Sequence, residues 1–187
     1  MDADRPDSVF VTIGAARWQA VLDDPPALCR RAVRAALAGA AAAPGLAAAE
    51  VGITLGDDQA IRQLNARHRG QDRATNVLAF PLLDLDHGRP SHAPGPGPLL
   101  LGDVVLALET VCAEARAAGR PVGHHLCHLV VHGTLHLLGF DHGDEDEARL
   151  MEDLERQVMA DLGLPDPYAE PAAAPPGRHH HAPEAVR

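Results

Sequence analysis

The chain has 187 residues, of which 46% are hydrophobic, and a formal net charge of −10 at pH 7. This size suits one domain with a sizeable core and some tail. The negative charge argues against nucleic-acid binding through the whole surface, although it leaves room for a local basic groove.

The first half of the chain predicts alternating strands and helices. Alternation of β-branched and small residues predicts a strand at 9–14. Asp24, followed by two prolines, predicts the cap and first turn of a helix that ends near residue 39. The next expected elements are a strand, a short helix and a strand, at 49–56, 58–67 and 74–83. Pro81 stops this third strand or places it at a sheet edge.

The second half begins with residues 85–98, whose proline and glycine content predicts a mobile loop. A fourth strand and two helices are expected at 99–108, 109–119 and 122–138. Asp144 and Glu147 form a capping box that opens a last helix. The order predicts an α/β fold: one small mixed four-stranded sheet packed with about five helices. This single domain spans 1–168, and residues 169–187 are predicted to be a disordered Pro/Ala/His tail.

The three cysteines, Cys29, Cys112 and Cys127, are far apart and form no CxxC pair. They are expected to be buried free thiols in a reducing compartment. The first residues, "MDADRPDS", are acidic and polar, unlike a signal peptide, and no apolar run is long enough to span a bilayer. These features predict a cytoplasmic protein.

A histidine stripe dominates the helix expected at 122–138. On a helical wheel, five histidines share one side of an otherwise apolar helix: His124, His125, His128, His132 and His136. A helix that is apolar on nearly all sides is buried, so its polar stripe must face a cleft or a ligand. The segment "HGTLHLLGFDH" continues this stripe with the histidine spacing of a large class of zinc peptidases.

His132 and His136 lie one helical turn apart and can bind one metal ion together. His128 lies two turns from His136, too far to share that ion. Gly139 is placed to end the helix in a left-handed conformation, which would bring His142 round as the third ligand. Three imidazoles leave a fourth position for water, as in a catalytic zinc site. We therefore expect one Zn²⁺ per chain, although other divalent transition metals can occupy such a site in vitro.

Gly133 stands where the zinc peptidases carry their glutamate base, which points away from peptide hydrolysis. A phosphodiester fits better, because a metal can polarise a phosphoryl oxygen while an arginine stabilises the developing charge. An arginine cluster precedes the third strand, at Arg62, Arg67, Arg69 and Arg73. It is either a phosphate-binding site or a solvated helix end.

Four segments resemble, in this order, the bacterial YbeY family: "RGQDRATNVLAFP", "LLGDVVLALETVCAEA", "HLVVHGTLHLLGFDHGDEDEARLMEDLE" and "GLPDPY". The resemblance covers roughly residues 50–168. It implies a zinc-dependent, single-strand-specific endoribonuclease that acts in 16S ribosomal RNA 3′ end maturation and ribosome quality control. The implied partners are ribosomal RNA and the ribosome or small-subunit proteins, with neither DNA nor a membrane.

The resemblance also implies roles for residues. His132, His136 and His142 match the zinc ligands, and Arg69 matches the functional arginine, so Arg69 and His136 are the expected catalytic residues. Candidates for substrate binding are Arg67, Arg73 and Asp103, the last of which could instead support a strand end. Asp141 either orients a ligand histidine or only forms the turn, and His128 is expected behind the ligands. Ala74 departs from the family, which often has proline there.

Two other functions fit the same residues. The first is a non-catalytic ribosome-assembly factor in which the metal only stabilises the fold. The second is a zinc peptidase, against which Gly133 is the main observation.

Overall fold

The computed structural model describes residues 8–40, 49–90, 99–141 and 143–169. Its strands are β1 (Val9–Ile13), β2 (Glu50–Gly56), β3 (Val77–Pro81), β4 (Leu85–Asp86), β5 (Arg89–Pro90) and β6 (Leu100–Ala107). Its helices are α1 (Trp18–Val21), α2 (Pro25–Gly39), α3 (Asp58–Arg69), α4 (Leu108–Ala117), α5 (Val122–Leu137) and α6 (Glu145–Asp161). The predicted tail, residues 169–187, lies outside this description from residue 170 on.

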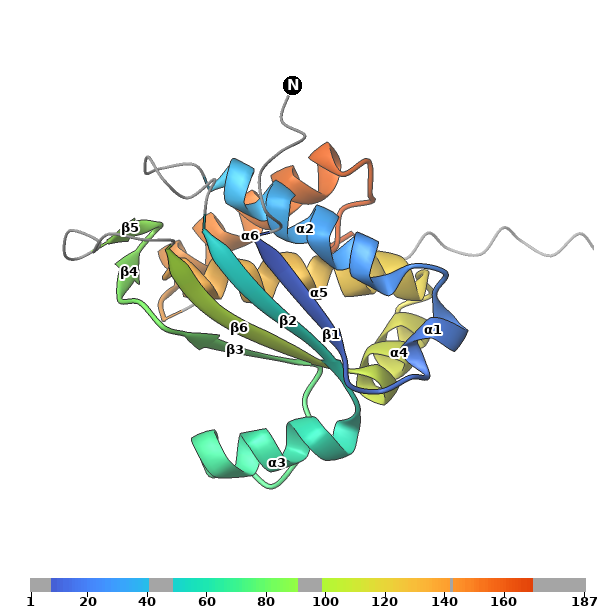
Figure 1. Ribbon diagram of the computed structural model, residues 1–187. Coiled ribbons are helices and arrows are strands. Elements are labelled where there is room, and N and C mark those ends of the chain that lie inside the picture. The colour runs from blue at the N-terminus through green and yellow to red at the C-terminus, as the bar shows by residue number, and fades with distance from the viewer. Residues whose placement is uncertain (1–7, 41–48, 91–98, 142, 170–187) are drawn as a thin grey trace, which may run out of the picture.

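A mixed four-stranded sheet organises the fold, in the order β1-β2-β6-β3 (Figure 1). The first three strands are mutually parallel, and β3 pairs antiparallel with β6. As predicted, the third strand lies at a sheet edge and ends at Pro81. The sequence-based prediction of an α/β fold on a small mixed sheet is confirmed.

Helices cover the two faces of the sheet unequally. On one face, alternate strand residues such as Ile53 and Val104 pack into the main core with α2 and α5. On the other face, α3 buries Ile61 against Leu78 and Val105. Figure 1 shows α3 apart from α2, α5 and α6, whereas its first residue, Asp58, accepts a hydrogen bond from the Thr110 amide of α4.

The predicted helix ends follow from local chemistry. The Asp24 side chain accepts a hydrogen bond of 2.9 Å from the Ala27 amide at the start of α2. Asp144 caps α6 by accepting from the amides of Asp146 and Glu147. These bonds satisfy amide groups that a helix leaves without partners in its first turn.

The structure corrects the prediction that residues 85–98 form only a mobile loop. β4 and β5 form a hairpin there, and Leu85 is buried. His87 and Gly88 both have positive φ angles, of 48° and 76°, as a tight two-residue hairpin turn requires. The Gly88 amide also donates to the Leu138 carbonyl, 2.7 Å away. This tertiary contact is invisible in the composition; residues 91–98 lie outside the described residues.

Helix α1 was also not predicted. It is a single turn that places Trp18 in the core, where the indole nitrogen donates to the Gly56 carbonyl at 2.8 Å. So short a helix carries too few residues to show a period.

The three cysteines are free, as predicted. Cys29 and Cys127 are buried, but Cys112 is only half-buried, which corrects the prediction of burial for all three. Burial raises the pKa of Cys29 to about 12 and that of Cys127 to about 11. Their thiols therefore stay protonated and unreactive at neutral pH. Within the described ranges, none of the helices has the length and apolar character needed to cross a membrane.

Candidate metal centre and phosphate site

Helix α5 packs against the sheet through β3 and β6 and against helices α2, α4 and α6. Most of its residues are therefore buried. The five predicted histidines are only half-buried and form a partly open stripe, at His124, His125, His128, His132 and His136. The helical-wheel prediction of a buried helix with one polar stripe is confirmed.

His132 and His136 lie close together, with 4.6 Å between their ring centroids. Nδ1 of His132 is 2.8 Å from a carboxylate oxygen of Glu155, and Nδ1 of His136 is 2.9 Å from the Phe140 carbonyl. Both partners are acceptors, so each Nδ1 carries a proton, and the tautomer that this selects places the lone pair of the ring on Nε2. This arrangement is typical of metal-binding histidines, whose other nitrogen donates to a carboxylate or carbonyl.

Glu155 is the residue of the candidate site that the sequence analysis missed. Its carboxylate is fully buried and accepts hydrogen bonds from His132, from His128 at 2.7 Å and from the Tyr168 hydroxyl. Burial alone would raise the pKa of this carboxyl, but the bonds from the two histidines and Tyr168 prevail and hold it well below its usual range. Glu155 is therefore a buried anion that orients His132.

A signal for Glu155 was present in the sequence. α6 buries Met151, Val158 and Met159 against the core, and Glu155 stands on this same stripe, four residues after Met151. A carboxylate at an apolar position of a helix needs a partner, and α5 is the element rich in suitable donors.

His128 presents its Nε2 to Glu155, so this nitrogen is already engaged. Its Nδ1 is buried and has no hydrogen-bond partner among the described residues. His128 lies next to His132, with 6.3 Å between the ring centroids, and its supporting role stays a prediction. His128 thus uses its Nε2 for a hydrogen bond, whereas His132 and His136 use Nδ1.

The turn after α5 is tightly held. Gly139 has the left-handed conformation predicted for it, with φ of 82°. A Cβ at Gly139 would lie 1.8 Å from the Leu85 carbonyl oxygen, so the hairpin packs directly on this turn. The turn leads to His142, the predicted third ligand, which lies outside the described residues.

The donors that are described fit a transition-metal ion. Imidazole suits zinc, and the hydrogen bonds of His132 and His136 set the tautomer that metal binding needs. Within the described ranges, no three His, Cys, Asp or Glu side chains are grouped to hold a metal. The site of the predicted ion therefore has two described donors, and its third predicted donor is His142.

Arg69 lies in the same cleft as His136. The cleft has a volume of about 330 Å³, and α3, β3 and the turn after α5 line it. Its lining residues are Arg69, Ala79, Pro81, His136, Gly139, Phe140 and Asp141. α3 ends at Gly70, in a left-handed conformation with φ of 67°, which leaves Arg69 in the last helical turn. Arg69 and the candidate ligand His136 thus line one cleft, although 67 positions separate them in the chain.

The other residues predicted to bind substrate are not among those that line the cleft. Arg67 is exposed on the last turn of α3, and Arg73 is exposed and donates to the Gln71 side chain at 3.1 Å. Arg62 is engaged by Asp72 in a two-point contact of 2.6 and 2.8 Å. Asp103 is exposed on β6 above Gly52 and is not among the residues that line the cleft.

A second polar chain runs from β3 to the start of the stripe. The Asn76 amide donates to the Glu114 carboxylate, which contacts Nε2 of His125 at 2.8 Å. Burial lowers the pKa of His125 although Glu114 opposes this effect. These bonds tie the segment before β3 to α4 and α5, so they hold the edge strand in place beside the cleft.

Gly133 faces the sheet. A Cβ at this position would lie 2.6 Å from a methyl group of Val104 and 3.4 Å from one of Val77. The glycine therefore lets α5 approach β6 closely. A glutamate here would project into the core, so the position could not supply a base to the metal site.

The family model described as Endoribonuclease YbeY matches residues 21–163. A relative from Rhodopseudomonas palustris (strain BisA53), named Endoribonuclease YbeY, is 47% identical over 88% of this chain and 92% of its own length. One of the same name from Azorhizobium caulinodans is 52% identical, over 83% and 92%. The solution structure of TM1509 from Thermotoga maritima matches with 21% identity and a TM-score of 0.49, over 89% of this chain and 99% of that one. On the sequence matches, the chain belongs to the YbeY family of endoribonucleases.

Proposed function

We propose that this protein is a zinc-dependent endoribonuclease that cuts single-stranded RNA in the cytoplasm. We further propose that its substrate is the 3′ end of the 16S ribosomal RNA precursor, and that it acts in ribosome quality control with the ribosome or small-subunit proteins as partners. One observation carries the proposal: Arg69 and His136 line the same cleft. Membership of the YbeY family supports the reaction class.

His132, His136 and His142 would hold the zinc ion. The chemistry that zinc supplies when bound is polarisation of a phosphoryl oxygen and easier deprotonation of water. Glu155 and the Phe140 carbonyl keep the Nδ1 protons of His132 and His136 in place. The rings are thereby pre-oriented before substrate arrives, which lowers the cost of assembling the site.

Arg69 would bind the scissile phosphate. A guanidinium matches two phosphate oxygens at once, and it stabilises the additional negative charge of the transition state. Arg67 and Arg73 are exposed nearby in sequence and would contact neighbouring phosphates. The chain has few aromatic residues, at 3%, so phosphate contacts should supply most of the affinity, and binding should weaken with salt.

The proposal predicts that Arg69→Ala and His136→Ala each lower cleavage of a single-stranded RNA spanning a small-subunit precursor end by about a hundredfold or more. Arg62→Ala is the matched control on α3, because Asp72 already occupies its guanidinium, and it should stay close to wild type. The three variants and wild type would be purified identically and assayed with and without chelator. Equal cleavage by all preparations would identify a contaminant and favour the non-catalytic assembly factor.

Metal binding should depend on pH in a defined direction. Imidazole binds a metal only when it is deprotonated, so a site with three histidine ligands should lose its ion as pH falls below about 6. Metal content after dialysis across a pH series would measure this loss. Full retention of metal at clearly lower pH would contradict a three-histidine site.

A further inference from the structure

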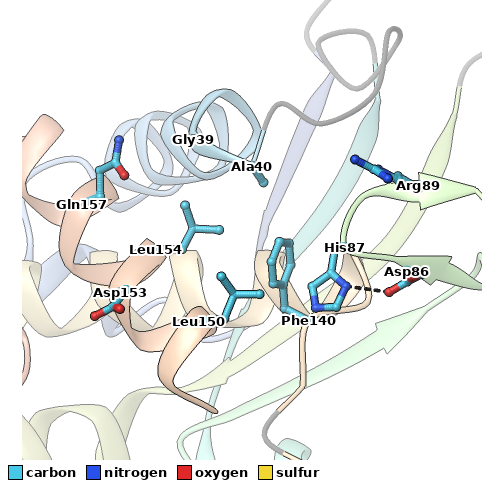
Figure 2. Close-up of a pocket in the computed structure, with 10 residues that line it drawn as sticks. All are labelled: Gly39, Ala40, Asp86, His87, Arg89, Phe140, Leu150, Asp153, Leu154 and Gln157. Carbon is cyan, nitrogen blue, oxygen red and sulfur yellow. Dashed lines mark hydrogen bonds and ion pairs between the residues drawn. The ribbon is translucent and has the colours of Figure 1, made fainter. Parts of the chain in front are cut away.

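A second cavity lies beside the cleft. It has a volume of about 610 Å³, within the range of about 300–1,000 Å³ that is usual for small-ligand sites. Figure 2 shows it between the end of α2, the β4–β5 hairpin and α6. The lining residues that matter here are His87, Arg89, Phe140, Leu150 and Leu154.

Phe140 joins the two cavities, because it lines both. Its carbonyl oxygen accepts the hydrogen bond from His136, on the side of the cleft. Its ring packs edge-on against His87, with 4.8 Å between the centroids, and stands between His87 and the leucines of α6 in Figure 2. The two cavities therefore adjoin at Phe140.

The wall that α6 contributes is apolar and open. Leu150 is 49% exposed and lies in the lining of the cavity, so a ligand can reach its side chain. Together with Leu154 and Phe140 it presents an apolar surface of the kind that accepts the flat face of a nucleobase. Such contacts tolerate any base, since every base has a π-face.

Charged or titratable side chains of both signs line this cavity: Asp86, His87, Arg89 and Asp153. Asp86 lies 2.5 Å from the His87 ring nitrogen, and the Asp153 carboxylate at the rim pairs with Arg156 at 2.7 Å. In the part of the chain that the structure describes, the Arg89 guanidinium takes part in no hydrogen bond or ion pair. Figure 2 shows it extending from the hairpin toward the cavity. It is therefore available for a phosphate oxygen.

From these observations we propose that the cavity binds an unpaired nucleotide of the RNA, adjacent to the nucleotide whose phosphate lies at Arg69. Its base lies against Leu150, Leu154 and Phe140, and its phosphate contacts Arg89. This inference rests on the proposed function, and it adds that the enzyme binds the RNA on the α6 side of the scissile phosphate. The pocket also explains a preference for single strands, because only an unstacked base can enter it.

The test uses the full-length, metal-loaded protein and a short fluorescent single-stranded RNA. Arg89→Ala and Leu150→Ala should each raise the Kd measured by anisotropy about fivefold or more, the size of one lost base or phosphate contact. Arg116→Ala, an exposed arginine on α4, is the control and should bind like wild type. An abasic nucleotide at the bound position should weaken binding to wild type but add little to the effect of Leu150→Ala.

Equal RNA affinity of wild type and all these variants would contradict the proposed nucleotide pocket. So would a Leu150→Ala protein that differs from wild type only in oligomeric state by sedimentation, because the leucine would then contact a second copy. Cleavage is assayed in parallel to separate the two proposals. If RNA binding depends on Arg89 and Leu150 but wild type does not cleave, the nucleotide pocket is supported and the nuclease proposal is refuted. If wild type cleaves and the variants bind RNA normally, the nuclease proposal is supported and the pocket is refuted.

Discussion

Gly133→Glu should prevent folding and should not create a peptidase. The new side chain would start 2.6 Å from a Val104 methyl group and place its carboxylate in the core between α5 and the sheet. Overpacking costs about 1–3 kcal/mol, and an unpaired buried charge about 3–5 kcal/mol more. The sum approaches the whole stability of an ordinary domain, about 5–15 kcal/mol. Soluble yield, thermal unfolding and casein turnover would measure the outcome.

Gly123→Ala provides the matched control in the same helix. A Cβ at Gly123 would meet side chains of Leu22 and Leu28 at 3.5 Å, an ordinary contact distance. Because alanine favours helix over glycine by about 1 kcal/mol, this variant should be as stable as wild type or slightly more so. A folded Gly133→Glu protein with an unchanged melting temperature, or one that hydrolyses casein, would show that position 133 faces the metal after all.

Glu155→Ala should reduce both stability and metal affinity. The change leaves His128, His132 and Tyr168 without their shared acceptor in a buried place. Removing one side of such a buried network costs about 3–5 kcal/mol. Loss of the group that orients a ligand histidine weakens metal binding by about 10–100-fold. Urea unfolding with and without chelator would separate the two effects.

Glu155→Gln tests the role of the charge more finely. It keeps the size of the side chain but replaces one acceptor oxygen with a donor, so it should fold better than Glu155→Ala and still bind metal more weakly than wild type. Glu152→Gln is the control, because Glu152 only pairs with Arg156 at the partly exposed surface of α6. Metal retention would be measured at increasing chelator concentrations. If Glu155→Gln retained metal as well as wild type does, Glu155 would have no role in metal binding.

The elements with a clear local pattern were predictable from the sequence. The strands of the main sheet begin and end within a few residues of their predicted positions, because apolar alternation, prolines and capping aspartates act locally. The histidine stripe and the left-handed Gly139 followed from helical geometry in the same way. A functional role of Arg69 was expected from the family resemblance and stays a prediction; the structure adds that Arg69 and His136 line one cleft.

The features that the sequence analysis missed share one physical cause: each depends on contacts between residues that are distant in sequence. Glu155 is meaningful only once α6 lies against α5, since its partner His132 is 23 positions away. The β4–β5 hairpin is held by Leu138 and Gly139 of another segment, which the composition of residues 85–98 does not reveal. Gly133 was interpreted as a missing base, whereas its orientation toward Val104 could be known only from the packing of α5.

The burial of α5 on nearly every side has a consequence for its tolerance of sequence change. In a saturation library, substitutions at its buried positions, such as Val130 and Leu135, should deplete soluble protein. Substitutions at His136 should leave normal amounts of protein that does not cleave. Abundance and activity, scored separately, would divide one helix into two interleaved classes of position, repeating every three to four residues.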